Sequence, residues 1–545
     1  MAPLAPIIVS LTLASPPLVS GSDATGWSLQ AGDRGGIFEQ WRPETRAVGG
    51  DGLRVAASAV AVQGGLDVTW TIENPTREPQ PLRRLHLPRC VLGSDIACMD
   101  FYRSGWPQKL SQEGQHRRMQ GTWPGTLYSP VAVIMNTTTA IGVSLQYPVL
   151  EYRHACSIAV QASGEGAWDI EIQFGGSLPE GDFPLPEHAM VPAGAERTYT
   201  VSVRATGDPR SWITTLEPYR SWFHQRYGGV QYVRSGAPIR GVILAFSHYQ
   251  GADNPAGWSP RVGRPDLDGY QVVMPVLDEA LSQASRAILW TPTGRAFRNP
   301  SLNLPFRFTS HWNSGAMVNA AACLKRVRTH ADRRWGLWWG HALRTTKAWD
   351  TLPVKPFDLE DPDQRQLAMT ELSGALQAGA TIIGLDEFTF GAVPEWQRVA
   401  WLEQMQQAAP GVTFCSEGRC SDVLHRLAPT WMDLYRHGPD RFGNTAMVRG
   451  RFLLADWLLP GHETWVGMLF DRSADPSVKA GHPSAAVTRR ALVDRVVGFG
   501  YVPVVFGEMD LRTLSAEAAG DGDPSADHRL VNEKKERHEV LLLLE

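Results

Sequence analysis

The sequence contains no long hydrophobic run. No window reaches the roughly 18 consecutive apolar residues that a membrane-spanning helix needs. It also lacks a phosphate-binding P-loop, a GxGxxG after a strand-like run, a GxSxG nucleophile elbow and an HExxH zinc motif. The formal net charge is -4, so there is no basic excess of the kind that binds nucleic acid. We therefore expect no membrane span, no nucleic-acid partner and no cofactor.

Cysteine is scarce, with 6 residues in 545 and no CxxC or zinc-binding spacing among them. Cys90 and Cys98 could close a small loop by a disulfide in an oxidising compartment. Unpaired, buried thiols explain the same residues equally well. The sequence leaves both alternatives open.

The N-terminus resembles a secretory signal. The run Ile7–Leu13 is apolar and small residues follow over Ser20–Ala24, although no Lys or Arg precedes the run and Pro16-Pro17 interrupts it. We expect residues 1–26 to include a signal peptide and the protein to be secreted or periplasmic.

The segment 27–205 is predicted to be an all-β sandwich, because its short apolar runs alternate with period two and are separated by Gly, Pro, Asn and Asp. The segment 206–239 is predicted to be a linker with a short helix over Pro218–Tyr227. The clearest predicted strands of the β domain are Leu53–Val62, Leu66–Glu73, Thr139–Gln146, Trp168–Phe174 and Thr198–Ala205.

From 240 to 510, eight strand-like runs alternate with amphipathic helical runs, which predicts a (β/α)8 TIM barrel of the α/β class. An open doubly wound sheet is the structural alternative, and 511–545 is expected to be a C-terminal tail. The predicted strands are Gly241–Ser247, Ala287–Thr291, Trp335–Trp339, Thr381–Leu385, Val412–Cys415, Thr430–Leu434, Glu463–Leu469 and Tyr501–Phe506. The predicted helices are Met274–Ser285, Ala316–Thr329, Gln364–Ala378, Glu395–Ala409, Ser421–Leu427, Thr445–Leu458 and Ala485–Val497.

Three carboxylates follow adjacent predicted strands, at the barrel face where active sites form. Asp386 and Glu387 come directly after a buried strand, and Glu417 comes just after the next one. Two such groups can protonate a leaving oxygen and attack carbon, as glycoside hydrolysis requires. A salt bridge or a helix cap could instead explain Asp386 and Glu387, and an ion pair with Arg419 could explain Glu417.

Other polar and aromatic residues near the predicted strand ends are candidates for binding substrate. Three of the histidines could alternatively line a metal site. The substrate-binding candidates are His248, Trp290, Arg295, Trp339, His341, Arg419, Tyr435, His437 and Glu508. The tryptophans near these ends could be platforms for sugar rings or core residues, namely Trp290, Trp312, Trp338, Trp339, Trp396, Trp431 and Trp465.

The Ile-Ile-Gly-Leu-Asp and Cys-Ser-Glu-Gly motifs, within this architecture, resemble glycoside hydrolases that join an N-terminal β-sandwich to a barrel, distantly like α-galactosidases and α-glucosidases. That resemblance implies Asp386 as nucleophile, and α-amylase-like enzymes imply Glu417 as acid/base. Gly384 stands where those groups carry Lys or Arg, and the first group takes its acid from strand six, where Asp433 lies. The Asp-Glu pair is also similar to that of β-hexosaminidases, which would make Glu387 the acid and Asp386 its partner.

These features predict a glycosidase that cleaves oligo- or polysaccharides, with Asp386 and Glu417 in a retaining mechanism. A carbohydrate-binding protein on a degenerate barrel and a metal-assisted barrel hydrolase are the two alternatives.

Overall fold

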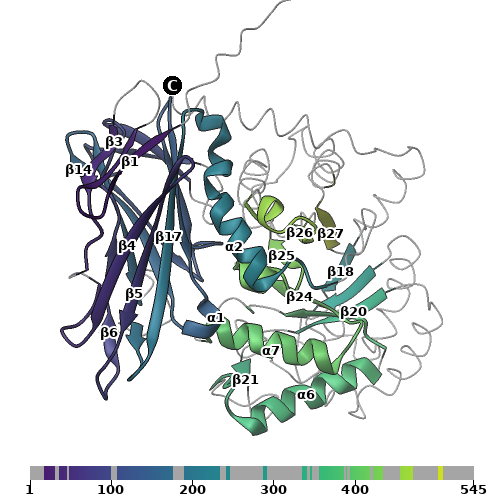
Figure 1. Cartoon of the computed structure of the whole chain (residues 1–545). Coiled ribbons are helices and arrows are strands. Elements are labelled where there is room, and N and C mark those ends of the chain that lie inside the picture. Colours follow the sequence, from purple (N-terminus) through teal and green to yellow (C-terminus); the bar gives the residue numbers. More distant parts are fainter. Residues whose placement is uncertain are drawn as a thin grey trace, which may run out of the picture.

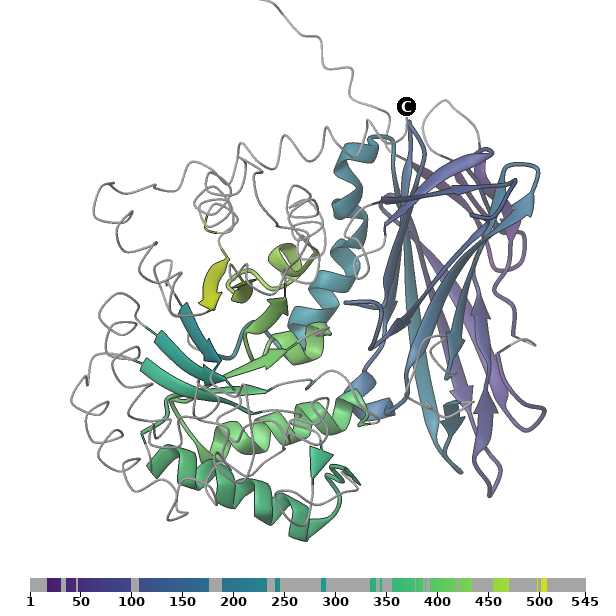
Figure 2. The ribbon, with the colours of Figure 1, turned by 180° about the vertical axis from the view of Figure 1, so that it is seen from behind.

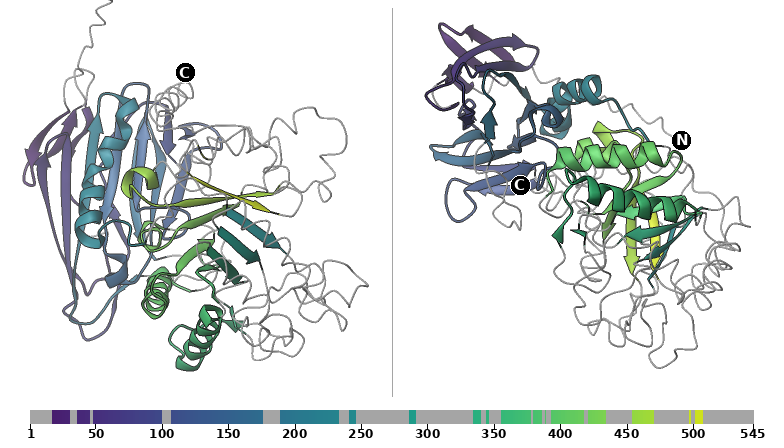
Figure 3. Two further views of the ribbon diagram at one scale, coloured as in Figure 1. Left: turned by 90° about the vertical axis from the view of Figure 1, so that its right-hand side faces the viewer. Right: turned by 90° about the horizontal axis from the view of Figure 1, so that it is seen from below.

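The structure is a computed structural model of the whole chain (Figure 1). An N-terminal region of antiparallel sheets is joined to a C-terminal region built around parallel strands, as the views from other sides also show (Figures 2 and 3). The structure describes residues 17–30, 36–45, 48–99, 107–175, 189–232, 241–245, 286–290, 334–339, 344–345, 355–377, 379–385, 388, 393–417, 421–433, 454–469, 497 and 501–506.

Two large antiparallel sheets make up most of the N-terminal region. The first has the strand order β10 (Pro107–Ser111), β9 (Asp95–Met99), β12 (Val131–Met135), β13 (Ala140–Gln146), β17 (Glu196–Thr206), β5 (Gly65–Glu73) and β4 (Arg54–Val62). The second runs β11 (Arg118–Trp123), β14 (Cys156–Gly164), β15 (Ala167–Phe174) and β7 (Arg84–His86), and β8 (Cys90–Val91) also pairs with β15.

Smaller sheets complete the described strands outside the parallel set. They are β1 (Leu18–Ser22), β2 (Gly26–Gln30) and β3 (Gly36–Trp41); β16 (Ala189–Val191) with β6 (Gln80–Leu82); and β21 (Arg344–Thr345) with β22 (Lys355–Pro356).

The five strands predicted in this region are confirmed, and the alternation that buries one face is clearest in β5. In β5, Leu66, Val68, Trp70 and Ile72 are fully buried, while the residues between them are half-buried. By contrast, β12 is buried at every position. Its sequence therefore has no period-two signal, and the strand was not predicted.

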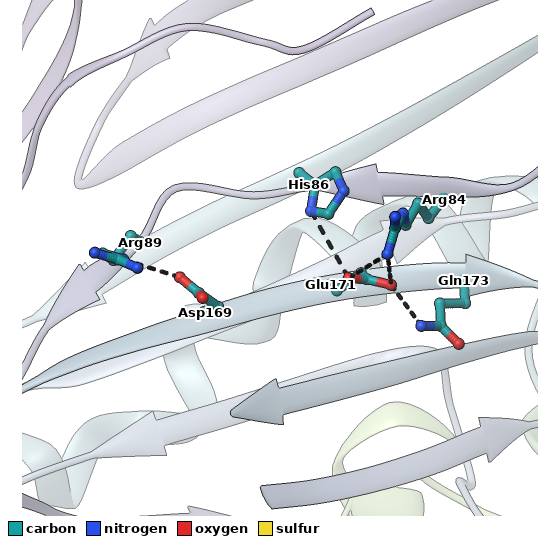
Figure 4. A network of polar contacts seen from close by, with 6 residues as sticks. All are labelled: Arg84, His86, Arg89, Asp169, Glu171 and Gln173. Atoms are coloured by element: carbon teal, nitrogen blue, oxygen red, sulfur yellow. Dashed lines mark hydrogen bonds and ion pairs between the residues drawn. The ribbon is translucent and has the colours of Figure 1, made fainter. Parts of the chain in front are cut away.

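The two large sheets meet through aromatic side chains. Phe174 of β15 lies 4.7 Å from Tyr199 of β17, measured between ring centroids, and Tyr147 stacks on Tyr199 at 5.9 Å. The outer face of the second sheet is polar (Figure 4). There Glu171 of β15 forms an ion pair with Arg84 of β7 at 3.4 Å, and Arg89 pairs with Asp169 at 3.1 Å. This division into an apolar side and a charged side is what an antiparallel sheet with one solvated face requires.

Cys90 and Cys98 are both free and buried, so the predicted disulfide alternative is wrong and the buried-thiol alternative is confirmed. Burial raises the pKa of the Cys90 thiol to about 12. The protonated thiol then packs as a small apolar group. Cys323 and Cys420 lie outside the described residues.

The end of the expected signal segment forms part of a sheet. β1 pairs with β2 along its whole length, and the Asp23 carboxylate accepts hydrogen bonds from Trp27 Nε1 at 2.7 Å and from the Ala59 amide at 3.2 Å. Residues 1–16 lie outside the described part of the chain. Export stays a prediction.

Two consecutive helices fill most of the segment expected as a linker. The 3-10 helix η2 (Pro209–Leu216) is capped by Asp208, and α2 (Glu217–Tyr227) confirms the predicted helix. Tyr219 and Phe223 of α2 are fully buried. Figures 1 and 2 show why, because α2 runs between the large sheets and the parallel strands.

Eight parallel strands organise the C-terminal region, and all eight predicted positions are confirmed within two residues at either end. Each strand pairs with the next, and the last pairs with the first, so the hydrogen-bonded order closes. The strands are β18 (Gly241–Ala245), β19 (Arg286–Trp290), β20 (Arg334–Trp339), β23 (Ile382–Leu385), β24 (Thr413–Glu417), β25 (Thr430–Asp433), β26 (Thr464–Leu469) and β27 (Val502–Phe506).

Among the described residues, three predicted helices of this region are confirmed as α6 (Pro362–Gln377), α7 (Glu395–Ala408) and the shorter α8 (Asp422–His425). Residues 454–458 are also helical. The predicted helices over Met274–Ser285 and Ala316–Thr329, and nearly all of Ala485–Val497, lie outside the described residues. Within the described part of the chain, no helix has the length and apolar character to cross a bilayer.

Candidate active site

Three of the predicted site residues lie on described strands, each as the last residue of its strand. Trp290 ends β19, Trp339 ends β20 and Glu417 ends β24. Parallel strands bring their carboxyl ends to one edge of the sheet, so these three positions share that edge. Of the three, only Glu417 has a described side chain, and it is half-buried. The other predicted site residues lie outside the described residues, namely Asp386, Glu387, His248, Arg295, His341, Arg419, Tyr435, His437 and Glu508.

Burial along the strands indicates which way Glu417 points. Ile383 and Phe414 are paired across β23 and β24, and both belong to the hydrophobic core that includes helices α6 and α7. Ile382 and Cys415 are equally buried, yet they lie outside that core. Side chains alternate between the two faces of a strand, so this second set faces the interior of the closed sheet. Glu417 is two residues beyond Cys415 and therefore faces the interior too.

The neighbours of Glu417 in the register are large and apolar. Glu417 pairs with Trp431 of β25, Trp431 pairs with Trp465 of β26, and Trp465 pairs with Val502 of β27. Both indoles are 1% exposed. Trp431 and Trp465 are therefore core residues, and the sugar-platform alternative is wrong for these two. At this level of the register the interior side chains on β25 and β26 are indoles, and the one on β24 is the carboxylate of Glu417.

The end of β23 lies beside the end of β24. Leu385, the last residue of β23, pairs with Ser416, and both side chains are fully buried. The next residue along β24 is Glu417, and the next residue in the sequence after Leu385 is Asp386. The burial of β24 ends at Glu417, where the strand emerges from the core.

The chain beyond Glu417 is anchored a few residues later. Ser421 caps α8 by accepting a hydrogen bond from the Leu424 amide at 3.4 Å, and its hydroxyl also donates to Glu395 at the start of α7. Glu395 in turn pairs with Arg398 at 3.0 Å. All three side chains are buried, so the start of α8 is held in one position.

Asp422 ties the same point to the N-terminal region. Its carboxylate accepts hydrogen bonds from Tyr219 Oη at 2.6 Å, from Trp123 Nε1 at 3.2 Å and from the Val423 amide at 2.8 Å. Burial raises the pKa of Asp422 to about 7, although these donors act in the opposite direction. The end of β24 is thus linked to α2 and to β11.

A histidine pair lies beside this anchor. His425 Nδ1 and Tyr128 Oη are 2.9 Å apart, and the His425 ring lies 4.4 Å from that of His462, between centroids. Burial holds the pKa of His425 well below its usual range, so this imidazole is neutral. Among the described residues, no group of three or more His, Cys, Asp or Glu side chains could hold a metal ion.

Sequence reasoning did not find Glu395, Asp422 or His425. The sequence predicted the helix over Ser421–Leu427 but none of these contacts. Asp422 and His425 bond to Trp123, Tyr128 and Tyr219, which are about 200 to 300 residues away in the chain, and Glu395 bonds to Ser421, 26 residues away. No local pattern reports a contact of that kind.

Comparison with known proteins gives structural likenesses only. No protein-family profile matches the chain, and no curated protein sequence matches it. Among solved structures, the chain is similar to an alpha-galactosidase from Thermus thermophilus in complex with p-nitrophenyl alpha-D-galactopyranoside. The identity is 12% and the TM-score 0.46, covering 87% of this chain and 94% of that one.

Two further solved structures show weaker likeness. A Flavobacterium johnsoniae GH31 dextranase complexed with glucose has 9% identity and a TM-score of 0.41, covering 97% of this chain and 65% of that one. A beta-arabinopyranosidase has 11% identity and a TM-score of 0.37, covering 74% and 65%. The solved structures that resemble this chain thus include several glycoside hydrolases.

Proposed function

We propose that the chain is a glycoside hydrolase in which an N-terminal β-sandwich precedes a (β/α)8 barrel. The contact between Phe174 and Tyr199 joins the two large sheets as a sandwich requires. The register of the eight parallel strands supports the barrel class. We followed the paired residues from Ile243 of β18 through each neighbouring strand in turn and back to β18. The path returns to the first strand at a position eight residues before Ile243. A shear of eight is the value for this class of barrel.

Asp386 and Glu417 are the proposed pair of catalytic carboxylates. The observation that carries this proposal is the pairing of Leu385 with Ser416. Glu417 follows Ser416 on the interior face of β24, and Asp386 follows Leu385 in the sequence, so we propose that its side chain lies on the same face. Neighbouring strands lie about 5 Å apart. Carboxyl groups about 5–5.5 Å apart are typical of glycosidases that retain the anomeric configuration.

The reaction then proceeds in two balanced steps. The Asp386 carboxylate attacks the anomeric carbon, the glycosidic C–O bond breaks, and the leaving oxygen takes a proton from the Glu417 carboxyl group. In the second step Glu417 takes a proton from water, and that water attacks the anomeric carbon. The ester bond to Asp386 breaks and both carboxyl groups return to their first state.

Glu387 is the competing acid, with Asp386 orienting an acetamido group of the substrate. Variants of Glu417 and Glu387 separate the two assignments of the acid. The remaining predicted residues, including His248, His341 and Glu508, are proposed to bind sugar hydroxyls around the mouth of the barrel.

The first test is turnover of p-nitrophenyl glycosides of common hexoses and pentoses by the purified protein. We expect at least one to be cleaved, and Asp386→Asn to lower kcat by several orders of magnitude. Binding of sugars without any turnover would favour the carbohydrate-binding alternative. Loss of activity with a chelator, restored by a divalent metal, would favour the metal-assisted one.

A further inference from the structure

A cleft of about 380 Å³ lies where the N-terminal region meets the outer helices of the C-terminal region. One wall comes from α1 (Val149–Tyr152) and the residue after it, and the other from α7 and the chain that leads into α6. Figure 1 shows α1 at the end of α7. The cleft contains none of the residues proposed above for catalysis. Its size lies within the range of small-molecule sites, which often form at such boundaries.

The floor of the cleft is apolar and aromatic. Trp396, on the first turn of α7, is half-buried and packs against the core, so one side of the indole is supported while the rest is accessible. Trp401 is 2% exposed and packs on Phe357 at 5.5 Å between centroids. Leu150 of α1 contributes from the opposite wall. A supported, partly open indole is a suitable surface for the apolar face of a sugar ring.

The rim carries hydrogen-bond donors and acceptors of balanced charge. Arg153 and Arg365 are basic, and Glu360 and Glu403 are acidic. Gln397 Nε2 donates to Glu360 Oε1 at 3.3 Å, and Arg426 donates to Glu403 Oε1 at 2.9 Å. Because the charges cancel, the cleft offers no net attraction to a phosphate or another anion. Mixed donors and acceptors around an aromatic floor instead fit a ligand with many hydroxyl groups.

Arg153 ends α1 at this rim, where its amide donates to the Val149 carbonyl. Arg153 has φ of 57°, in the left-handed region that favours glycine, and its side chain is exposed at the cleft. A large residue in this conformation costs backbone strain. Glycine would end α1 without that strain but would supply no guanidinium group to the rim.

We propose that this cleft is a second carbohydrate-binding site, which holds one or two units of a neutral oligosaccharide against Trp396. The proposal takes its ligand class from the proposed function but concerns a separate site. A polysaccharide held there would keep the enzyme on its substrate while the barrel cleaves another part of the chain.

The test is calorimetric titration of the Glu417→Gln protein with maltotetraose, cellotetraose, mannotetraose and stachyose. We expect at least one to bind in two classes of site, and Trp396→Ala to weaken one class at least tenfold. Trp41→Ala is the matched control, because Trp41 is also half-buried but lies on β3, away from the cleft. If Trp396→Ala does not fold, Ala400→Leu takes its place, because a leucine at this exposed helix position fills the cleft. It should weaken the same class of binding.

The outcomes separate this proposal from the proposed function. If aryl glycosides are not cleaved but Trp396-dependent binding is present, the cleft stands and the catalytic proposal fails. If aryl glycosides are cleaved but oligosaccharide binding is the same in the cleft variants and in Trp41→Ala, the cleft proposal is wrong. Absence of binding for all four tetrasaccharides at millimolar concentration would also overturn it.

Discussion

The phenol of Tyr219 donates a 2.6 Å hydrogen bond to the buried carboxylate of Asp422. This bond joins α2 to the start of α8, five residues after the candidate catalytic Glu417. The N-terminal region therefore supports the candidate site through a buried polar contact as well as through apolar packing.

Asp422→Asn should flatten the pH dependence of stability. Burial raises the pKa of Asp422 from 3.8 to about 7 in the folded protein. The folded state therefore binds this proton more tightly than the unfolded state. The resulting stability is fully present below pH 3.8 and is lost as the pH rises through about 7. In the wild type this group lowers the Tm between pH 5 and pH 8, and asparagine cannot contribute to that change.

The measurement is Tm at pH 5 and pH 8 by differential scanning calorimetry. Asp169→Asn is the control, because Asp169 is 52% exposed in a surface ion pair and should leave the wild-type difference unchanged. Equal pH dependence in wild type and Asp422→Asn would show that Asp422 does not titrate in this range.

Tyr219→Phe should lower the free energy of unfolding by about 1–3 kcal/mol, because it removes a donor from a buried acceptor. Chemical denaturation at pH 7 measures the change. Tyr227→Phe is the matched control on the same helix. Its hydroxyl donates at 3.3 Å to Glu151, which is 41% exposed, so water can replace the lost bond. Similar losses in the two variants would contradict the importance of the contact with Asp422.

Gly336→Ala should destabilise the closed sheet. Gly336 of β20 pairs with Ile382 of β23, and a Cβ there would lie 2.1 Å from the Ile382 carbonyl oxygen. Backbone atoms on two strands must move apart to relieve that overlap, at a cost of about 1–3 kcal/mol. Gly229→Ala is the control, since a Cβ at Gly229 meets nothing within 4 Å. A Tm for Gly336→Ala equal to that of Gly229→Ala would argue against this close approach of the strands.

The sequence predicted a strand well where the burial of its residues shows as a pattern of apolar residues along the strand itself. The run Thr381–Leu385 is continuously apolar because β23 is buried on both faces, and β5 alternates because only one face is buried. β12 was not predicted because its five buried residues do not alternate, and no helical runs flank them as α6 and α7 flank β23. Strand prediction thus depended on alternation within a strand or on helical runs beside it.

The candidate site was predictable only in part. The position of Glu417 at a strand end followed from the sequence, and the register adds that it faces the interior beside Trp431. The burial of Trp431 and Trp465 could not be separated in advance from a sugar-binding role, because both roles use the same residue at the same place. The anchor at Asp422 depends on Trp123 and Tyr219, whose approach is decided by the tertiary fold.

Azide rescue of Glu417→Gln tests the central claim most directly. The variant should retain much of the first step on an activated p-nitrophenyl glycoside, because that leaving group needs little protonation. The second step should slow by several orders of magnitude, because no base remains to activate water. Added azide needs no base, so it should restore turnover and give a glycosyl azide with the configuration of the substrate. An azide product of inverted configuration, or a Glu417→Gln variant as active as wild type while Glu387→Gln is inactive, would contradict the assignment of Asp386 and Glu417.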